Sequence, residues 1–338
     1  MKEYKLEIIN NYRNELMGIA TILVFLDHSK KFEWIGKGVI IRSLQTLFRQ
    51  GGIGVDIFLI LSGIGLYMSL SRNDNIKEFY KRRFFRIIPT YLSIALIYYL
   101  WEWWYQKESI LVFFSKISTI SYWINGDGRF WYISYIIIFY LLYPLVYKHI
   151  LPSKKKTIGI FLVTFLVQLA VLIVNLDAYR NCQLALSRMP ITILGCALGK
   201  MVYEDREFKI RLPLYSLAVF AMMWVVRMLG IIDLSDGWIT LYDKTSNMFA
   251  VFGFCLLYPI VCGKLSDHSK LPLCGILKKA LLWIGKHSLE IYLVHVALYF
   301  VFVSYGFTNV KLYWLVVLPL TVALAYIDKL LVTKIVKR

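Results

Sequence analysis

The feature that most constrains this chain is a series of long apolar segments separated by short clusters of basic residues. A helix needs about 20 mostly apolar residues to cross a bilayer. We therefore predict an all-α fold, a polytopic membrane helical bundle, and expect the weaker stretch 110–123 to form a loop or an interfacial helix. The ten predicted transmembrane helices are 14–30, 53–71, 87–105, 130–150, 157–176, 188–203, 212–231, 245–263, 287–304 and 311–331.

The composition supports a membrane protein and argues against other classes. Hydrophobic residues make up 59% and charged residues 18% of the 338 residues, against about 45–50% and about 25% in soluble domains. The net charge of +18 comes from Lys and Arg between the apolar segments, whereas a nucleic-acid-binding protein gathers them on one surface. The five cysteines show no paired or metal-type spacing. We expect no nucleic-acid partner, no metal and no tightly bound cofactor.

The distribution of Lys and Arg predicts the orientation in the membrane. If the N-terminus is cytoplasmic, the segments on that side hold 26 Lys and Arg and the opposite segments hold 12. Cytoplasmic loops carry the excess of basic residues, so we expect both termini to be cytoplasmic. We expect residues 1–338 to form one membrane-embedded domain with no appended soluble domain, in contact with membrane lipid.

Ionisable residues inside predicted spans are costly and are candidates for function. Asp27 and His28 close the first span, and Asp56 lies just inside the second. Because the two spans run in opposite directions, we expect these three residues to meet at one depth, where a carboxylate would orient the imidazole as a general base. The alternative is that His28 is an interfacial residue with a solvated ring.

The segment GKHSLEIYLVH, residues 285–295, contains a second histidine close to other polar residues. Ser288, Tyr292 and His295 are spaced to share one face of a helix, with Glu290 turned away from that face. A catalytic role for His295 and a role as polar contacts between helices both fit this pattern.

A basic cluster in FYKRRFFRIIPTYL, residues 79–92, precedes the third span. Arg83 and Arg86 share a helical face, and Arg82 lies beside them. Arginine matches phosphate oxygens in a bidentate manner, so the cluster could hold the diphosphate of a nucleotide-bearing donor. The alternative is pairing with lipid headgroups.

These features form an ordered series that resembles acyltransferase family 3, a family of integral-membrane O-acyltransferases. The resemblance covers most of the chain. Five stretches carry it: YRNELMGIATILVFLDHS at 12–29, GGIGVDIFLILSGIGLY at 51–67, FYKRRFFRIIPTYL at 79–92, WYISYIIIFYLLYPLV at 131–146 and IGKHSLEIYLVH at 284–295. A weaker stretch, RMPITILGCALGK at 188–200, resembles the Arg–x–Pro…Gly segment of the family.

The resemblance implies roles for residues that match the family pattern. The essential histidine of the first span falls on His28, the late histidine on His295, and the arginine pair linked to acyl-CoA on Arg83 and Arg86. The glycine-rich entry and aspartate of the second span fall on Gly52, Gly54 and Asp56, with Ser62 after them.

One position departs from the family pattern. The family usually has Arg or Lys eleven residues before the first histidine, and this chain has Met17 there. Arg13, one turn further back, either compensates for the missing charge or the donor is handled differently.

The resemblance implies acyl transfer, with acetyl the usual group, from cytoplasmic acyl-CoA as co-substrate to a hydroxyl of a carbohydrate or cell-envelope acceptor. His28 would act as the base or as a transient acyl carrier, and Ser62 or the glycine backbone as oxyanion donors. The expected location is the bacterial cytoplasmic membrane. The alternatives are a transporter or flippase for a polar or lipid-linked solute and a module without catalysis. The sequence leaves the acceptor, the acyl group and the oligomeric state open.

Overall fold

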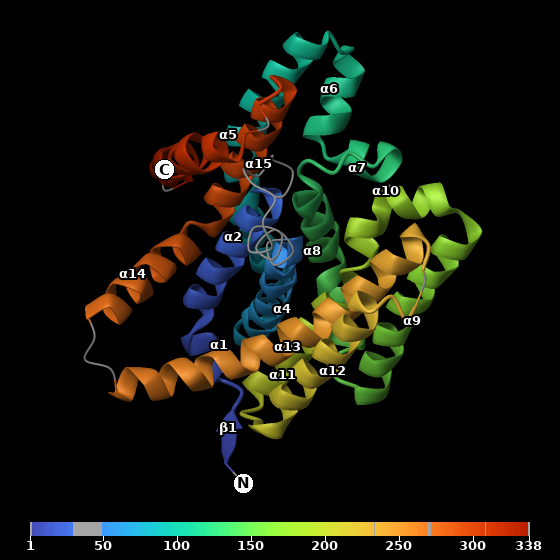
Figure 1. The fold of residues 1–338 in the computed structure, drawn as a ribbon, viewed down its shortest axis with the longest axis vertical. Coiled ribbons are helices and arrows are strands. Elements are labelled where there is room, and N and C mark those ends of the chain that lie inside the picture. Colours follow the sequence, from blue (N-terminus) through green and yellow to red (C-terminus); the bar gives the residue numbers. More distant parts are fainter. Residues whose placement is uncertain (1, 30–48, 233, 269–271, 308, 337–338) are drawn as a thin grey trace.

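The computed structural model describes residues 2–29, 49–232, 234–268, 272–307 and 309–336, which are almost entirely helical (Figure 1). The longer helices are α2 (Arg13–Ser29), α4 (Ile53–Arg72), α5 (Ile76–Gln106), α8 (Trp131–His149), α9 (Lys154–Val174), α10 (Leu176–Leu186), α11 (Met189–Tyr203), α12 (Arg211–Met228), α13 (Asp236–His268), α14 (Pro272–Lys286), α15 (Ser288–Ser304) and α17 (Leu318–Val336). The shorter elements are β1 (Glu3–Lys5), α1 (Ile8–Asn11), the 3₁₀ turn η1 (Arg49–Gly52), α6 (Ile110–Ile117), α7 (Ile120–Asn125), β2 (Glu207–Lys209), α16 (Val310–Leu312) and the π-helical segment η2 (Tyr313–Val317).

The structure confirms an all-α polytopic membrane protein. Within the described residues, eight helical segments are long and apolar enough to cross a membrane. The pair α14 and α15, bent by 74° at His287, would make a ninth. The first predicted span is the 17-residue helix α2. Each of the ten predicted spans falls largely on a helix, while the count of ten and the orientation stay predictions.

Several helices extend beyond the predicted spans. Helix α5 begins at Ile76 and not near residue 87, because the Asn75 side chain caps it by accepting a hydrogen bond from the Glu78 N–H. The basic cluster therefore lies within a continuous helix. The stretch 110–123 forms the two short helices α6 and α7, and Leu111 and Phe114 of α6 are exposed.

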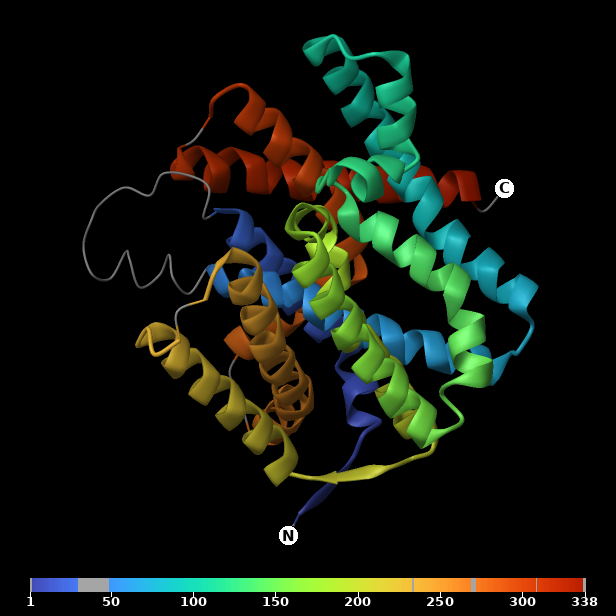
Figure 2. The same cartoon turned by 90° about the vertical axis from the view of Figure 1, so that its right-hand side faces the viewer.

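Helices α2 and α4 lie in the middle of the molecule (Figures 1 and 2), and glycines bring their backbones close to each other and to α11. A Cβ atom on Gly54 would lie 2.3 Å from the Ala20 carbonyl oxygen of α2. A Cβ atom on Gly63 would lie 2.6 Å from the Cys196 nitrogen of α11. Small residues are the usual means by which membrane helices approach closely, so the glycines fix the positions of α2, α4 and α11.

The beginning of the chain is tied to the segment that follows α11. Strands β1 and β2 pair in antiparallel fashion, with Tyr4 opposite Phe208, and Lys5 forms an exposed ion pair with Asp205. This two-stranded ribbon lies at the bottom of Figure 2. It holds the chain where α2 begins, next to the arginines described below.

We predict that Gly195→Val destabilises the protein and that Gly159→Ala does not. A Cβ atom on Gly195 would lie 2.7 Å from the Ile60 carbonyl oxygen, whereas one on Gly159 meets nothing within 4 Å. Overpacking of this kind costs about 1–3 kcal/mol, while alanine for a helical glycine with free space around it stabilises by roughly 0.5–1 kcal/mol. Thermal unfolding of both variants in detergent checks this, and an equal fall in Tm would contradict the account.

Candidate functional site

Three of the four predicted donor residues line a cavity between α2, α4, α5, α8 and α15. Arg13, Arg83 and Arg86 line one part of it, and Val24 and Tyr132 are also in its wall. The structure thus brings the arginine that was expected to compensate for Met17 together with the arginine pair of α5.

A second, more open pocket of about 1310 Å³ adjoins the first. Both pockets are lined by Arg13, Arg83 and Arg86. The open pocket, but not the first, is also lined by Glu7, Asn73 and the predicted donor residue Arg82. The three shared arginines therefore stand at the junction between an open vestibule and the interior cavity.

The backbone of α4 holds these arginines in place at Gly65. Arg83 Nη2 donates a hydrogen bond to the Gly65 carbonyl oxygen at 2.8 Å. A Cβ atom on Gly65 would lie 2.9 Å from Arg13 Nη2. Any larger residue at position 65 would therefore force the Arg13 guanidinium to move. Among the described residues, no carboxylate lies within ion-pairing distance of Arg13, Arg83 or Arg86. Three cations at such a junction attract an anion, and guanidinium groups suit phosphate.

The cavity follows one face of α2 toward His28. Arg13, Met17 and Val24 line it, and their spacing places them on one side of the helix. At 1.5 Å per residue, the lining extends about 16 Å along α2. His28 continues the same face one turn beyond Val24, about 6 Å further on. Met17, where the family has a basic residue, contributes an apolar wall.

Helix α15 presents a matching face. Ser288 and Tyr292 line the cavity, and His295 follows on the same side of the helix. Glu290 is turned away, as predicted, and accepts a hydrogen bond from Lys329 of α17 at 2.6 Å. The faces of α2 and α15 converge on their two histidines.

The two histidines contact each other directly. His28 Nδ1 lies 2.8 Å from His295 Nε2. The hydrogen-bond partner of His28 Nδ1 is therefore an imidazole and not the carboxylate that the sequence predicted. His295 is buried, whereas His28 and its neighbour Asp27 are half-buried. The Tyr299 ring stacks on His28 with centroids 5.1 Å apart.

Tyr313 is a residue of this site that the sequence did not reveal. Its hydroxyl donates a hydrogen bond to the Phe25 carbonyl of α2 at 2.7 Å, and its oxygen lies 3.2 Å from His295 Nε2. Tyr313 is fully buried and begins the π-helical segment η2, a geometry that is frequent at functional sites. In the sequence it is one tyrosine among many in an apolar run, and no pattern distinguishes it.

The position of Asp56 corrects a prediction. Its carboxylate lies 3.3 Å from Arg188 Nε of the α10–α11 connection, in a pocket also lined by Gln168 and Lys244. The cause is helix geometry, because Gly54 faces α2 and a residue two positions later points about 200° away. Asp56 therefore faces α9, α11 and α13, while His28 faces α15 and η2.

Arg188 is the buried partner of Asp56, and sequence reasoning gave it no role in the site. Its side chain is 4% exposed, and its guanidinium lies over the Trp131 ring, 4.9 Å from the centroid. It also donates a hydrogen bond to the Leu184 carbonyl. The Arg–x–Pro stretch at 188–190 was the signal for it. Arg188 and Asp56 join α4 to the start of α11 and to α8.

The other predicted supporting residues lie around these features. Ser62 lines the cavity. Gly54 serves close packing of α4 on α2, and Gly52 precedes α4 with its Cβ position 3.5 Å from Lys244 Nζ. Among the described residues, no group of His, Cys, Asp and Glu side chains could hold a metal ion.

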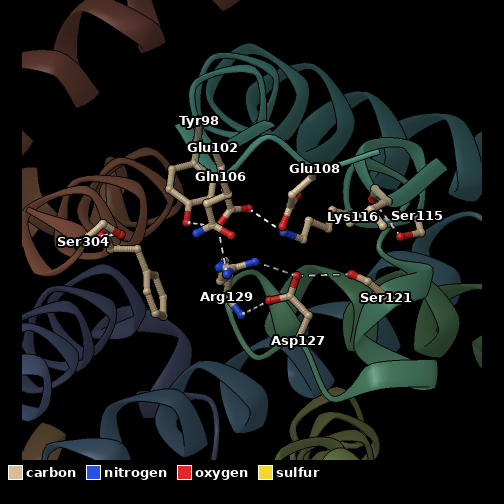
Figure 3. Close-up of polar contacts among 12 residues, drawn as sticks. Tyr98, Glu102, Gln106, Glu108, Ser115, Lys116, Ser121, Asp127, Arg129 and Ser304 are labelled. Carbon is tan, nitrogen blue, oxygen red and sulfur yellow. Dashed lines mark hydrogen bonds and ion pairs between the residues drawn. The ribbon is translucent and has the colours of Figure 1, made fainter. Parts of the chain in front are cut away.

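A polar network joins α5 to the α7–α8 connection (Figure 3). The buried Glu102 pairs with Lys116 at 2.9 Å and with Arg129 at 2.8 Å. Arg129 also pairs with Asp127, and its guanidinium lies 5.8 Å from the Phe300 ring centroid. Phe300 contacts Tyr299, the residue stacked on His28. The network therefore supports the histidine end of the site.

Comparison with known proteins gives matches over most of the chain. The profile of the family described as "Acyltransferase domain" matches residues 16–327. The protein named O-acetyltransferase OatA from Staphylococcus aureus (strain NCTC 8325 / PS 47) is 26% identical over 330 residues, covering 84% of this chain and 51% of that protein. Putative O-acetyltransferase SACOL0978 from S. aureus (strain COL) is 21% identical over 304 residues, covering 77% of this chain and 48% of that protein.

A shorter match involves the protein named putative acetyltransferase ORF330 from Acidianus two-tailed virus. It is 26% identical over 129 residues, which is 36% of this chain and 38% of that protein. The chain spans about half the length of the O-acetyltransferases that it matches. No solved structure matches it significantly.

We predict that Asp56→Asn and Arg188→Met each destabilise the protein by about 3–5 kcal/mol, because each leaves an uncompensated charge in a buried site. The double variant should lose less than the sum, since neither charge then remains. Asp177→Asn is the matched control, because Asp177 is 88% exposed in its ion pair with Arg180 and such pairs contribute about 0–1 kcal/mol. Unfolding in detergent measures the stability of all four variants. If the loss in the double variant equals the sum of the two single losses, Asp56 and Arg188 do not interact as described.

Proposed function

Because the chain belongs to the acyltransferase family whose profile covers residues 16–327, we propose that it transfers an acetyl group from acetyl-CoA to a hydroxyl of a carbohydrate or cell-envelope acceptor. The relatives named O-acetyltransferase support acetyl as the group and oxygen as the acceptor atom. The long apolar helices support a reaction that takes place in a membrane. We assign that membrane to the bacterial cytoplasmic membrane, with both chain ends in the cytoplasm.

The observation that carries this proposal is the shared position of Arg13, Arg83 and Arg86 in two adjoining cavities. The diphosphate of acetyl-CoA binds the three guanidinium groups from the open side. The pantetheine arm then extends into the inner cavity along the face that contains Met17 and Val24. This places the thioester near the end of the cavity, one helical turn before His28.

Arg13 supplies the positive charge that Met17 lacks. Both residues line the inner cavity, and Arg13 lies one turn nearer the open vestibule. The missing charge at position 17 therefore leaves an apolar wall beside the pantetheine arm, while the phosphates meet Arg13 together with the pair on α5. Donor binding in this chain accordingly uses three arginines at the junction of the vestibule and the inner cavity.

His28 acts as the general base. Its Nε2 atom takes the proton of the acceptor hydroxyl, and the oxygen attacks the thioester carbonyl carbon. The C–S bond then breaks, and the CoA thiolate leaves and takes up a proton. This role requires the tautomer in which His28 Nδ1–H donates to His295 Nε2, the atom 2.8 Å away. Tyr313, whose hydroxyl donates to the Phe25 carbonyl, lies with its oxygen 3.2 Å from His295 Nε2 and packs its ring edge-on against the His295 ring.

The acceptor approaches from the histidine end, opposite the vestibule. Along α2, Arg13 at the vestibule and His28 are separated by about 22 Å. This separation lets the donor enter at one end of the helix and the acceptor at the other. Donor and acceptor therefore reach the site from opposite faces of the membrane. Ser62, in the cavity wall, is a candidate donor of a hydrogen bond to the oxyanion.

We predict that two variants separate binding from transfer. Arg83→Ala with Arg86→Ala should weaken acetyl-CoA binding at least about tenfold, because charged hydrogen bonds to the phosphates are lost. His28→Ala should bind acetyl-CoA within a few-fold of the unchanged protein and lose about 100-fold or more in thiol release, because the base is absent. Calorimetry and thiol detection measure the two effects in purified protein supplied with membranes as the source of acceptor.

Lys77→Ala is the matched control, since Lys77 is an exposed cation of α5 outside both cavities. It should change neither quantity. The proposal is wrong if the arginine variant binds acetyl-CoA as tightly as Lys77→Ala does, or if His28→Ala releases thiol at a rate within a few-fold of the unchanged protein.

A further inference from the structure

A third pocket, separate from the passage to His28, lies between α5, α15 and α17. Its volume is about 700 Å³. It is lined by Arg86 and Phe85 of α5, by Lys286 at the end of α14, and by Glu290 and Lys329. Arg86, Ser288 and Leu289 line both this pocket and the inner cavity, so the two adjoin, while α17 contributes side chains to this pocket and not to the inner cavity.

The charges in this pocket favour a phosphate. Arg86, Lys286 and Lys329 contribute three positive charges and Glu290 contributes one negative charge. Glu290 is 4% exposed and bonds Lys329 at 2.6 Å, while the Lys329 side chain remains 40% exposed. A net charge of about +2 remains among these four groups, together with the Ser288 and Thr333 hydroxyls that also line the pocket. Arginine, lysine and hydroxyl groups are the usual ligands of phosphate oxygens.

The location of the pocket points to a lipid as the source of that phosphate. Three predicted spans, 87–105, 287–304 and 311–331, end at the level of Arg86, Lys286 and Lys329. The predicted topology therefore puts the pocket at the depth of the headgroups. Its neighbouring apolar side chains face outward, because Phe85 is 57% and Leu331 is 56% exposed. Exposed apolar side chains beside a cationic pocket match the acyl chains and the headgroup of one phospholipid.

We propose that this pocket binds the phosphate headgroup of an anionic phospholipid, with its acyl chains along α5 and α17. Lys286 and Arg86 bind the phosphate directly. Glu290 competes with it for Lys329, so the affinity depends on the charge of Glu290. Such a lipid would contact the same Arg86 that borders the donor cavity.

Native mass spectrometry of the purified full chain tests this, with phosphatidylglycerol and phosphatidylcholine of identical acyl chains as probes. Lys286→Glu should weaken phosphatidylglycerol binding at least about fivefold, because a nearby cation is replaced by an anion. Glu290→Gln should strengthen it, because Lys329 then turns to the lipid. Lys279→Glu, an exposed residue of the same helix α14 outside the pocket, should leave it unchanged.

Three results would overturn the proposal. Equal losses in Lys286→Glu and Lys279→Glu would mean that only general surface charge attracts the lipid. Equal retention of phosphatidylcholine would show that the pocket does not select anionic headgroups. Displacement of phosphatidylglycerol by an excess of inorganic phosphate or CoA would assign the pocket to a soluble phosphate, whereas retention in their presence supports the lipid. None of these readouts depends on acetyl transfer.

Discussion

The close approach of α4 to its neighbours at glycines is the constraint on which the rest of the structure depends. Gly54 admits the backbone of α2 and Gly63 admits that of α11, and a membrane offers little hydrophobic drive to replace such packing. Helix α2 carries Arg13 and His28 at its two ends, so its fixed position on α4 sets both ends of the site. Gly65 of α4 then places the guanidinium groups of Arg13 and Arg83.

The charged side chains of the helices fall into two classes according to their partners. Asp56 with Arg188 and Glu102 with Lys116 and Arg129 are paired inside the protein, which makes them costly to break and suits them to a structural role. Arg13, Arg83 and Arg86 instead line open space, with no carboxylate within ion-pairing distance among the described residues. Because an unpaired charge in a membrane domain is costly, these arginines are best explained by an anionic ligand.

Sequence patterns predicted the helices and the residues of each helix face, but not the contact between His28 and His295. Apolar length placed each span, because a bilayer imposes one thickness on all of them. The shared face of Ser288, Tyr292 and His295 followed from helical periodicity alone. The contacts of individual side chains could not be predicted from the sequence, because they depend on how each helix, such as α4, is rotated about its axis. Asp56 was expected at His28 and lies at Arg188, and the contact of Tyr313 with His295 joins segments that no local pattern relates.

The most direct test of the central claim is to map where an electrophilic donor reacts. In bromoacetyl-CoA the reactive carbon lies next to the thioester, and an imidazole nitrogen that displaces bromide retains a stable adduct. The account predicts an adduct on His28, identified by peptide mass spectrometry, that is suppressed by excess CoA and by Arg83→Ala with Arg86→Ala. A protein that turns over acetyl-CoA but carries adducts only on residues away from His28 and His295 would contradict it.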